Sequence, residues 1–139
     1  MARDKAARNA YNRAQGEKCQ AQAREYDAKR AANDEKIRRL NEAKTKLVDA
    51  LQDYNTFMVN VEKIESEIPD SNFKGVIRDN FKKEVDEVVL DINSDINHHQ
   101  RNLSTLSGEI ASLEAENGNL IEWAKNAWDM AANFFQSLV

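Results

Sequence analysis

The chain has 139 residues, with 32% charged and 7% aromatic side chains, and it holds only 4 Gly, 1 Pro and 1 Cys. Its length allows one domain at most, and its composition is typical of a coiled coil or another long-helix protein, not of a compact globule. A lone cysteine excludes an intramolecular disulfide, and no apolar run approaches the roughly 18 residues of a membrane-spanning helix. The polar residues 1–5 also lack the apolar region of a conventional signal peptide.

Charge is unevenly distributed along the chain. Residues 1–46 carry 13 Lys and Arg against 7 Asp and Glu, whereas residues 47–139 carry 7 against 17. A basic segment can indicate binding to nucleic acid or to a membrane surface. We prefer the interpretation that a basic helix pairs with an acidic one and that complementary charge fixes an antiparallel register. Acids such as Glu17 and Glu25 interrupt the basic segment, so we expect neither nucleic acid nor a membrane as partner.

Residues 1–34 are predicted to form a basic, weakly packed helical extension, rich in the good helix formers Ala, Arg, Lys and Gln. The heptad pattern of the following segment can be traced back through Asn33, Arg30, Tyr26, Ala23 and Cys19. These side chains bury little apolar area, so we expect the helix to fray at Gly16 and before it.

Residues 35–116 are predicted to form a helical hairpin with its turn at 68–75. Apolar residues before the turn follow a 3-4 alternation, at Ile37, Leu40, Leu47, Leu51, Tyr54, Met58, Val61 and Ile68. The only proline, Pro69, should end the first helix, and Asp70 or Ser71 should cap the second. Gly75 is expected just inside the second helix, where the missing Cβ would let another segment approach closely.

The apolar stripe continues after the turn. Its members are Phe81, Val85, Val88, Ile92, Ile96, Leu103, Leu106, Ile110 and Leu113. His99 occupies a stripe position beside His98, a pair that could indicate a metal site or a pH switch. Further ligands at suitable spacing are absent from the sequence, so we interpret His99 as a tolerated polar residue. No catalytic motif is present either, and we expect no enzyme activity, no metal and no cofactor.

Residues 117–139 form an aromatic-rich C-terminal helix in this prediction. Asn119 and Glu122 fit a capping box, which would start a separate third helix at Leu120. We favour a continuous second helix with a weak point at 117–119, because Leu120, Ala124, Ala127, Ala131, Phe134 and Leu138 stay in phase with the stripe.

Large apolar side chains in this last segment lie off the stripe, namely Trp123, Trp128, Met130 and Phe135. A contiguous exposed apolar surface marks a binding site, either for a partner helix or for a membrane surface. The opposite face carries Glu122, Lys125 and Asp129 instead of a basic cluster, which favours a protein partner.

These patterns predict an all-α fold, an elongated antiparallel two-helix hairpin of the coiled-coil type, with a short third helix at the C-terminus as a variant. Two paired helices bury little area per residue, so such a hairpin is only marginally stable alone. We therefore expect it to oligomerise or to bind a partner helix.

A long helix, a short break with an aromatic-x-Gly motif and a second long helix resemble the WXG-type small helical proteins of type VII secretion. The resemblance covers residues 35–116, and the motif reads Phe73-Lys74-Gly75, with Phe in place of Trp. The arrangement is most similar to the YwqH-like branch, whose members are encoded beside LXG-domain toxins.

The resemblance implies a non-catalytic targeting factor or chaperone that binds the helical LXG domain of a toxin. The resulting pre-secretion complex would be recognised by the secretion ATPase and its machinery, and a second small helical protein could join it. The protein would be cytoplasmic, with export alongside the toxin as an alternative. Related proteins carry an export signal of Tyr or Phe with an acid four residues on, which this sequence lacks. The signal would then lie on the toxin or on the second protein.

We predict partner-binding residues along the stripe and in the aromatic tail, at Leu47, Leu51, Tyr54, Met58, Leu103, Leu106, Ile110, Trp123, Trp128, Phe134 and Phe135. Phe73 and Gly75 form the turn motif. The alternative function is that of a homo-oligomeric coiled-coil structural protein without a role in secretion.

Overall fold

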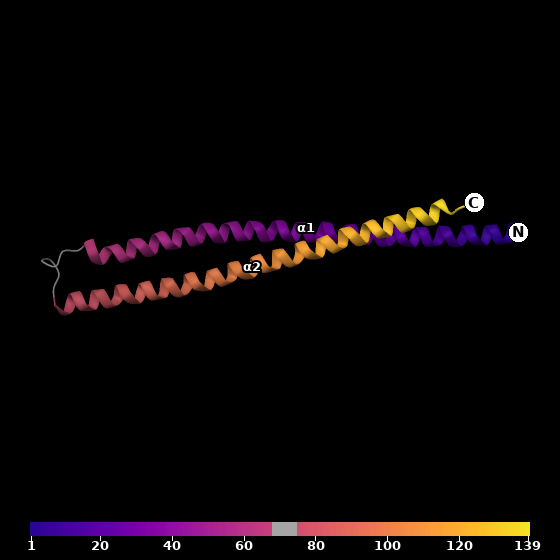
Figure 1. The fold of residues 1–139 in the computed structure, drawn as a ribbon. Helices are drawn as coiled ribbons and strands as arrows, with labels where there is room; N and C mark the ends of the chain where they lie inside the picture. The colour runs from indigo at the N-terminus through magenta and orange to yellow at the C-terminus, as the bar shows by residue number, and fades with distance from the viewer. Residues whose placement is uncertain (68–74) are drawn as a thin grey trace. The chain divides into compact units, whose positions relative to one another are not determined.

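A computed structural model describes residues 1–67 and 75–139, and within these ranges the chain forms two helices and no strand (Figure 1). Helix α1 spans Ala2–Glu67 and helix α2 spans Val76–Gln136. The predicted all-α helical hairpin is confirmed. The residues group into two compact units, each with a segment of both helices. Unit 1 comprises Met1–Arg39 and Ile110–Val139, and unit 2 comprises Leu40–Glu109.

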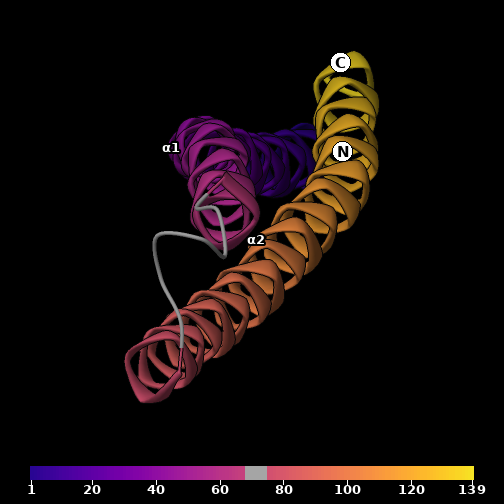
Figure 2. The same ribbon diagram turned by 90° about the vertical axis from the view of Figure 1, so that its left-hand side faces the viewer.

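Both helices are continuous through their described ranges (Figure 2). Helix α2 passes through residues 117–119 without a break, so the separate third helix starting at Leu120 does not form. The reason is that this point of the helix is held by packing, since Asn117 is 8% exposed and Leu120 only 1%. An isolated helix glycine such as Gly118 costs about 1 kcal/mol relative to Ala, which packing on both sides of it can offset.

The core of unit 2 is a stripe of branched apolar side chains where α1 and α2 face each other, which we call the seam. Its buried members are Leu51, Val61, Val85, Ile92 and Ile96, and around them pack Leu47, Tyr54, Met58, Phe81, Val89 and Leu103. The prediction for Val88 was wrong, because this side chain is 42% exposed and its neighbour Val89 packs on the seam instead. Spacings of three and four residues both fit between Val85 and Ile92, so only packing decides which valine faces inward.

The seam of unit 1 is filled by small side chains. Its buried members are Cys19, Ala23, Ala124, Ala127 and Ala131, together with Leu120 and the larger Ile110 and Leu113. Ala23 is fully buried at 0% exposure and Ala131 is 1% exposed. Within residues 1–34 the buried apolar side chains are the small ones of Cys19 and Ala23, and small side chains allow two helices to approach closely.

The beginning of α1 is also fixed against the end of α2, in an antiparallel pairing. The side-chain amide of Asn9 exchanges two hydrogen bonds with the backbone of Val139, at 2.7 and 2.9 Å. The Asn12 amide donates to the carbonyl of Ser137 at 3.4 Å. These amides satisfy backbone groups just beyond the last turn of α2 that have no partner within the helix.

Gly16, the expected site of fraying, is buried inside continuous α1. A Cβ atom placed on it would lie 2.8 Å from the ring of Phe135. The phenyl ring thus occupies the space that any other residue's side chain would need at this position. Phe135, predicted to be part of a free aromatic surface, instead packs over α1.

Close packing in unit 1 can be tested with Ala23→Leu. We expect the larger side chain to lower the free energy of unfolding by about 1–3 kcal/mol, because overpacking forces the helices apart. Ala50→Leu makes the same change at an exposed position of α1 and should stay within about 0.5 kcal/mol of the parent. Urea unfolding followed by circular dichroism measures the free energy of unfolding of both variants. Equal stability of the two would show that the seam can accommodate a leucine at position 23 without strain.

The predicted turn falls largely outside the described residues, and this includes Ile68, Pro69, Asp70, Ser71 and Phe73. Gly75 is described and directly precedes α2, with a φ of +75° and its carbonyl accepting the amide of Asp79 at 3.1 Å. A Cβ on Gly75 would meet nothing within 4 Å among the described residues. The positive φ therefore favours glycine here, and none of the described residues makes the close approach that we expected.

This explanation predicts different effects for two substitutions of Gly75. Gly75→Ala should lower the free energy of unfolding by about 1 kcal/mol, because alanine is strained at positive φ. Gly75→Asn should lower the free energy of unfolding less than Gly75→Ala does, since asparagine tolerates a positive φ. Thermal unfolding compares the two variants, and a larger loss for Asn than for Ala would point to steric crowding as the cause.

Candidate partner-binding surface

The predicted partner-binding residues of the stripe lie in the chain's own seam. Leu51 and Ile110 are buried at 8% and 7% exposure. The others, Leu47, Tyr54, Met58, Leu103 and Leu106, are half-buried. Five of them pack together in the core of unit 2, namely Leu47, Leu51, Tyr54, Met58 and Leu103. Only the outer edges of these five are therefore open to a partner.

Tyr54 illustrates how the seam of unit 2 is closed at its edge. Its hydroxyl donates to Oδ2 of Asp95 at 2.9 Å, and this hydrogen bond raises the pKa of Tyr54. Its ring also meets the imidazole of His99 edge-on, with centroids 6.3 Å apart. His99 is half-buried beside this ring, and the described residues contain no group of three potential metal ligands around it or elsewhere.

The two tryptophans of the C-terminal segment lie on different sides of the seam in unit 1. The ring of Trp123 packs against Tyr26 with centroids 5.9 Å apart, whereas the indole nitrogen of Trp128 donates to Oδ2 of Asp27 at 3.2 Å. Five residues along a helix correspond to a rotation of about 140°. The predicted single aromatic surface is therefore divided into two surfaces, which we call the Trp123 side and the Trp128 side.

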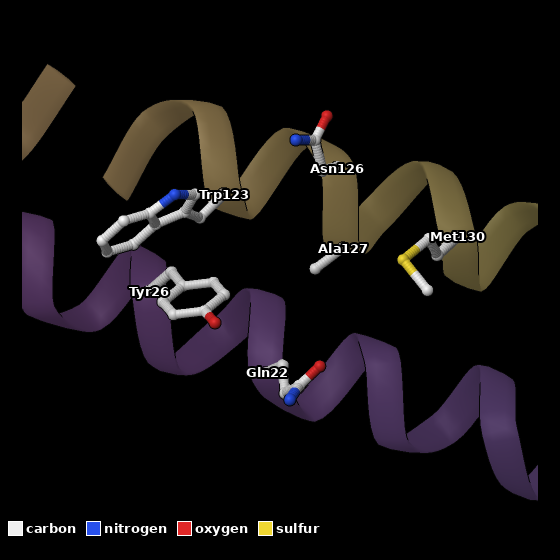
Figure 3. A pocket seen from close by; sticks show the side chains of 6 residues that line it. All are labelled: Gln22, Tyr26, Trp123, Asn126, Ala127 and Met130. Atoms are coloured by element: carbon white, nitrogen blue, oxygen red, sulfur yellow. The ribbon is translucent and has the colours of Figure 1, made fainter. Parts of the chain in front are cut away.

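The Trp123 side is hollowed. Its first pocket, of about 330 Å³, is lined by Gln22, Tyr26, Trp123, Asn126, Ala127 and Met130. Figure 3 shows the rings of Trp123 and Tyr26 next to each other at one end of this pocket and Met130 at the other. A second pocket, of about 230 Å³, is lined by Met130, Asn133, Phe134 and Ser137. Met130 is thus shared, and it is 51% exposed.

On the Trp128 side, contacts within the chain occupy more of the apolar surface. Phe135 is half-buried and covers Gly16, and Trp128 is 37% exposed with its polar nitrogen bound to a carboxylate. Ile121, seven residues before Trp128 and 50% exposed, is the most open apolar residue here. The Trp128 side therefore has a charged rim, from Asp27, and its apolar side chains have more contacts within the chain than those of the Trp123 side.

Polar residues also occupy the seam of unit 1. Asn33 is 4% and Asn117 8% exposed, and the Asn117 amide donates to Oδ1 of Asp34 at 2.9 Å. Among the described residues, Nδ2 of Asn33, Oδ1 of Asn117 and Nε of Arg30 have no hydrogen-bond partner. Buried amides of this kind cost stability but restrict the register in which helices can pair.

A salt bridge flanks these amides, with the Lys29 ammonium 3.3 Å from Glu116. The Asn33 amide, which lies close to the Glu116 carboxylate without reaching hydrogen-bonding geometry, and the Lys29 ammonium together lower the pKa of Glu116. This cross-helix pair supports the interpretation of the charge asymmetry as complementary charge beside the seam, although an exposed pair of this kind contributes little stability.

The lowered pKa of Glu116 predicts a pH dependence of stability. Because the carboxyl binds its proton more weakly in the folded chain, its contribution is complete above the ordinary value of 4.5 and is lost as the pH falls through the folded pKa. Glu116→Gln should therefore flatten the fall in melting temperature below about pH 5. Glu122→Gln, which removes a carboxylate from the face opposite the seam, serves as the control, and identical pH profiles for the two variants would contradict the assignment.

Comparison with models of protein families, with curated proteins and with solved structures gives no match. Within the described ranges, neither helix contains an apolar stretch that could cross a membrane.

The apolar pattern did not predict the polar half of the Trp123 side, formed by Gln22, Asn126, Asn133 and Ser137. A signal for it was nevertheless present, because Gln22 and Asn126 each directly precede a seam alanine, Ala23 and Ala127. A small seam residue leaves the flanking position uncovered, which is where a pocket can open.

Proposed function

We propose that this chain is a non-catalytic targeting factor or chaperone that binds the helical LXG domain of a type VII secretion toxin in a pre-secretion complex. The observation that carries the proposal is the Trp123 side of unit 1. Here Trp123 and Met130, 49% and 51% exposed, border two pockets on a chain that is otherwise rich in charge. Apolar surface of this kind on a paired helix suits the docking of a further helix.

The helical plan supports the same function. Two long helices joined across an aromatic-x-Gly element are the arrangement of the WXG-type proteins, and Gly75 lies at the beginning of α2 in a conformation that glycine adopts readily. Adding partner helices to a two-helix seam covers side chains that the two helices alone leave exposed. A partner that binds only the folded chain also raises its apparent stability by mass action.

Co-expression tests the proposal directly. The chain would be produced with the helical N-terminal domain of the LXG toxin encoded beside it, and the products analysed by size-exclusion chromatography with light scattering. We expect a discrete complex and a melting temperature of the complex above that of the chain alone. The catalytic domain of the same toxin is the control and should elute separately.

A different result would favour the alternative function. If the chain forms a well-defined homo-oligomer whose mass does not change when the helical domain is added, it is a structural coiled-coil protein. Apolar side chains exposed in unit 2, such as Phe57, Val59 and Leu90, would then be the first candidates for the contact between copies.

A further inference from the structure

The two pockets of the Trp123 side repeat each other along α2. The first is lined on this helix by Trp123, Asn126, Ala127 and Met130, and the second by Met130, Asn133, Phe134 and Ser137. Each residue of the second set stands seven positions after its counterpart in the first. The lining of the first pocket on α2 thus recurs one heptad later as the lining of the second.

A heptad repeat of pockets has a geometric consequence. Seven residues advance a helix by about 10.5 Å, so the pockets recur at this distance along α2. Coiled-coil helices insert side chains into holes with this same heptad repeat. A neighbouring helix can therefore place one apolar side chain in each pocket if these side chains are seven residues apart.

The chemistry of the pockets restricts the occupant further. Among the described residues that line them, the polar groups are the amides of Gln22, Asn126 and Asn133, the hydroxyls of Tyr26 and Ser137 and the indole nitrogen of Trp123, and none is charged. A Lys or Glu of a partner would lose water here without gaining a counter-ion, which is unfavourable. Neutral polar side chains, in contrast, can exchange hydrogen bonds with the amides.

We infer that a helix of the partner docks along the Trp123 side, with two apolar side chains one heptad apart in the two pockets and neutral polar residues between them. The inference rests on the proposed function and specifies its binding site. The Trp128 side is a poorer site, because the Trp128 indole nitrogen is bound to Asp27 and the Phe135 ring is packed over Gly16.

Two matched substitutions test which side binds. Met130→Lys places a charge between the two pockets, and Ile121→Lys places the same charge on the Trp128 side of the same helix. The parent side chains are 51% and 50% exposed, so neither change disturbs the seam. We expect Met130→Lys to weaken binding of the co-expressed LXG helical domain at least tenfold and Ile121→Lys to change it less than twofold, measured by isothermal titration calorimetry.

Asn126→Glu, at another exposed pocket residue, should weaken binding in the same way and guards against an effect specific to Met130. Circular dichroism would verify that all variants retain the helix content of the parent. Equal losses for Met130→Lys and Ile121→Lys, or a larger loss for Ile121→Lys, would overturn the inference while leaving the proposed function intact. Failure of the unmodified chain to bind the domain would refute the proposed function and the docking site together.

Discussion

Two paired helices can cover only the faces that they turn toward each other, and in unit 1 these faces include the small buried residues Gly16, Cys19, Ala23, Ala124, Ala127 and Ala131. Small side chains let the backbones approach closely, as the full burial of Ala23 and Ala131 indicates. A close pair of helices leaves no space for aromatic rings between them. The large side chains of this segment therefore lie beside the seam, as Trp123 and Trp128 do, or over a glycine, as Phe135 does. The exposed apolar surface of unit 1 is thus a consequence of how tightly its helices pack.

The same seam contains amides where apolar residues would bury more area. Asn33 and Asn117 are almost fully buried, yet one amide nitrogen and one carbonyl oxygen of this pair lack hydrogen-bond partners among the described residues. Removing such groups from water reduces stability. What they contribute is selectivity, because a shifted register would bury an amide against alanine and break the hydrogen bond from Asn117 to Asp34. In unit 1, a cost in stability and a defined register are therefore two effects of the same residues.

Heptad spacing predicted the fold well, because one period governs both helices. The phase traced back from Ile37 correctly placed Ala23 and Cys19 in the seam. Burial was harder to predict than phase, since small residues look weakly packed in a sequence although they can be fully enclosed. The choice between Val88 and Val89 and the positive φ of Gly75 depend on local geometry that spacing does not encode. The two sides of the aromatic segment follow from helical rotation, but their different chemistry comes from Tyr26 and Asp27, about a hundred residues away in the sequence.

The proposed docking site beside the seam also determines what binding would require of the chain. If a partner had to insert between α1 and α2, it would first expose Ala23, Ala127 and Leu120 to water and separate the amides of Asn9 and Asn12 from the end of α2. A helix that lies along the Trp123 side leaves all these contacts in place. It covers Trp123, whose ring already packs against Tyr26, so little conformational entropy of this side chain is lost on binding. Under the proposed function, unit 1 would therefore stay folded as a helical pair before binding and serve as a preorganised half of the proposed complex.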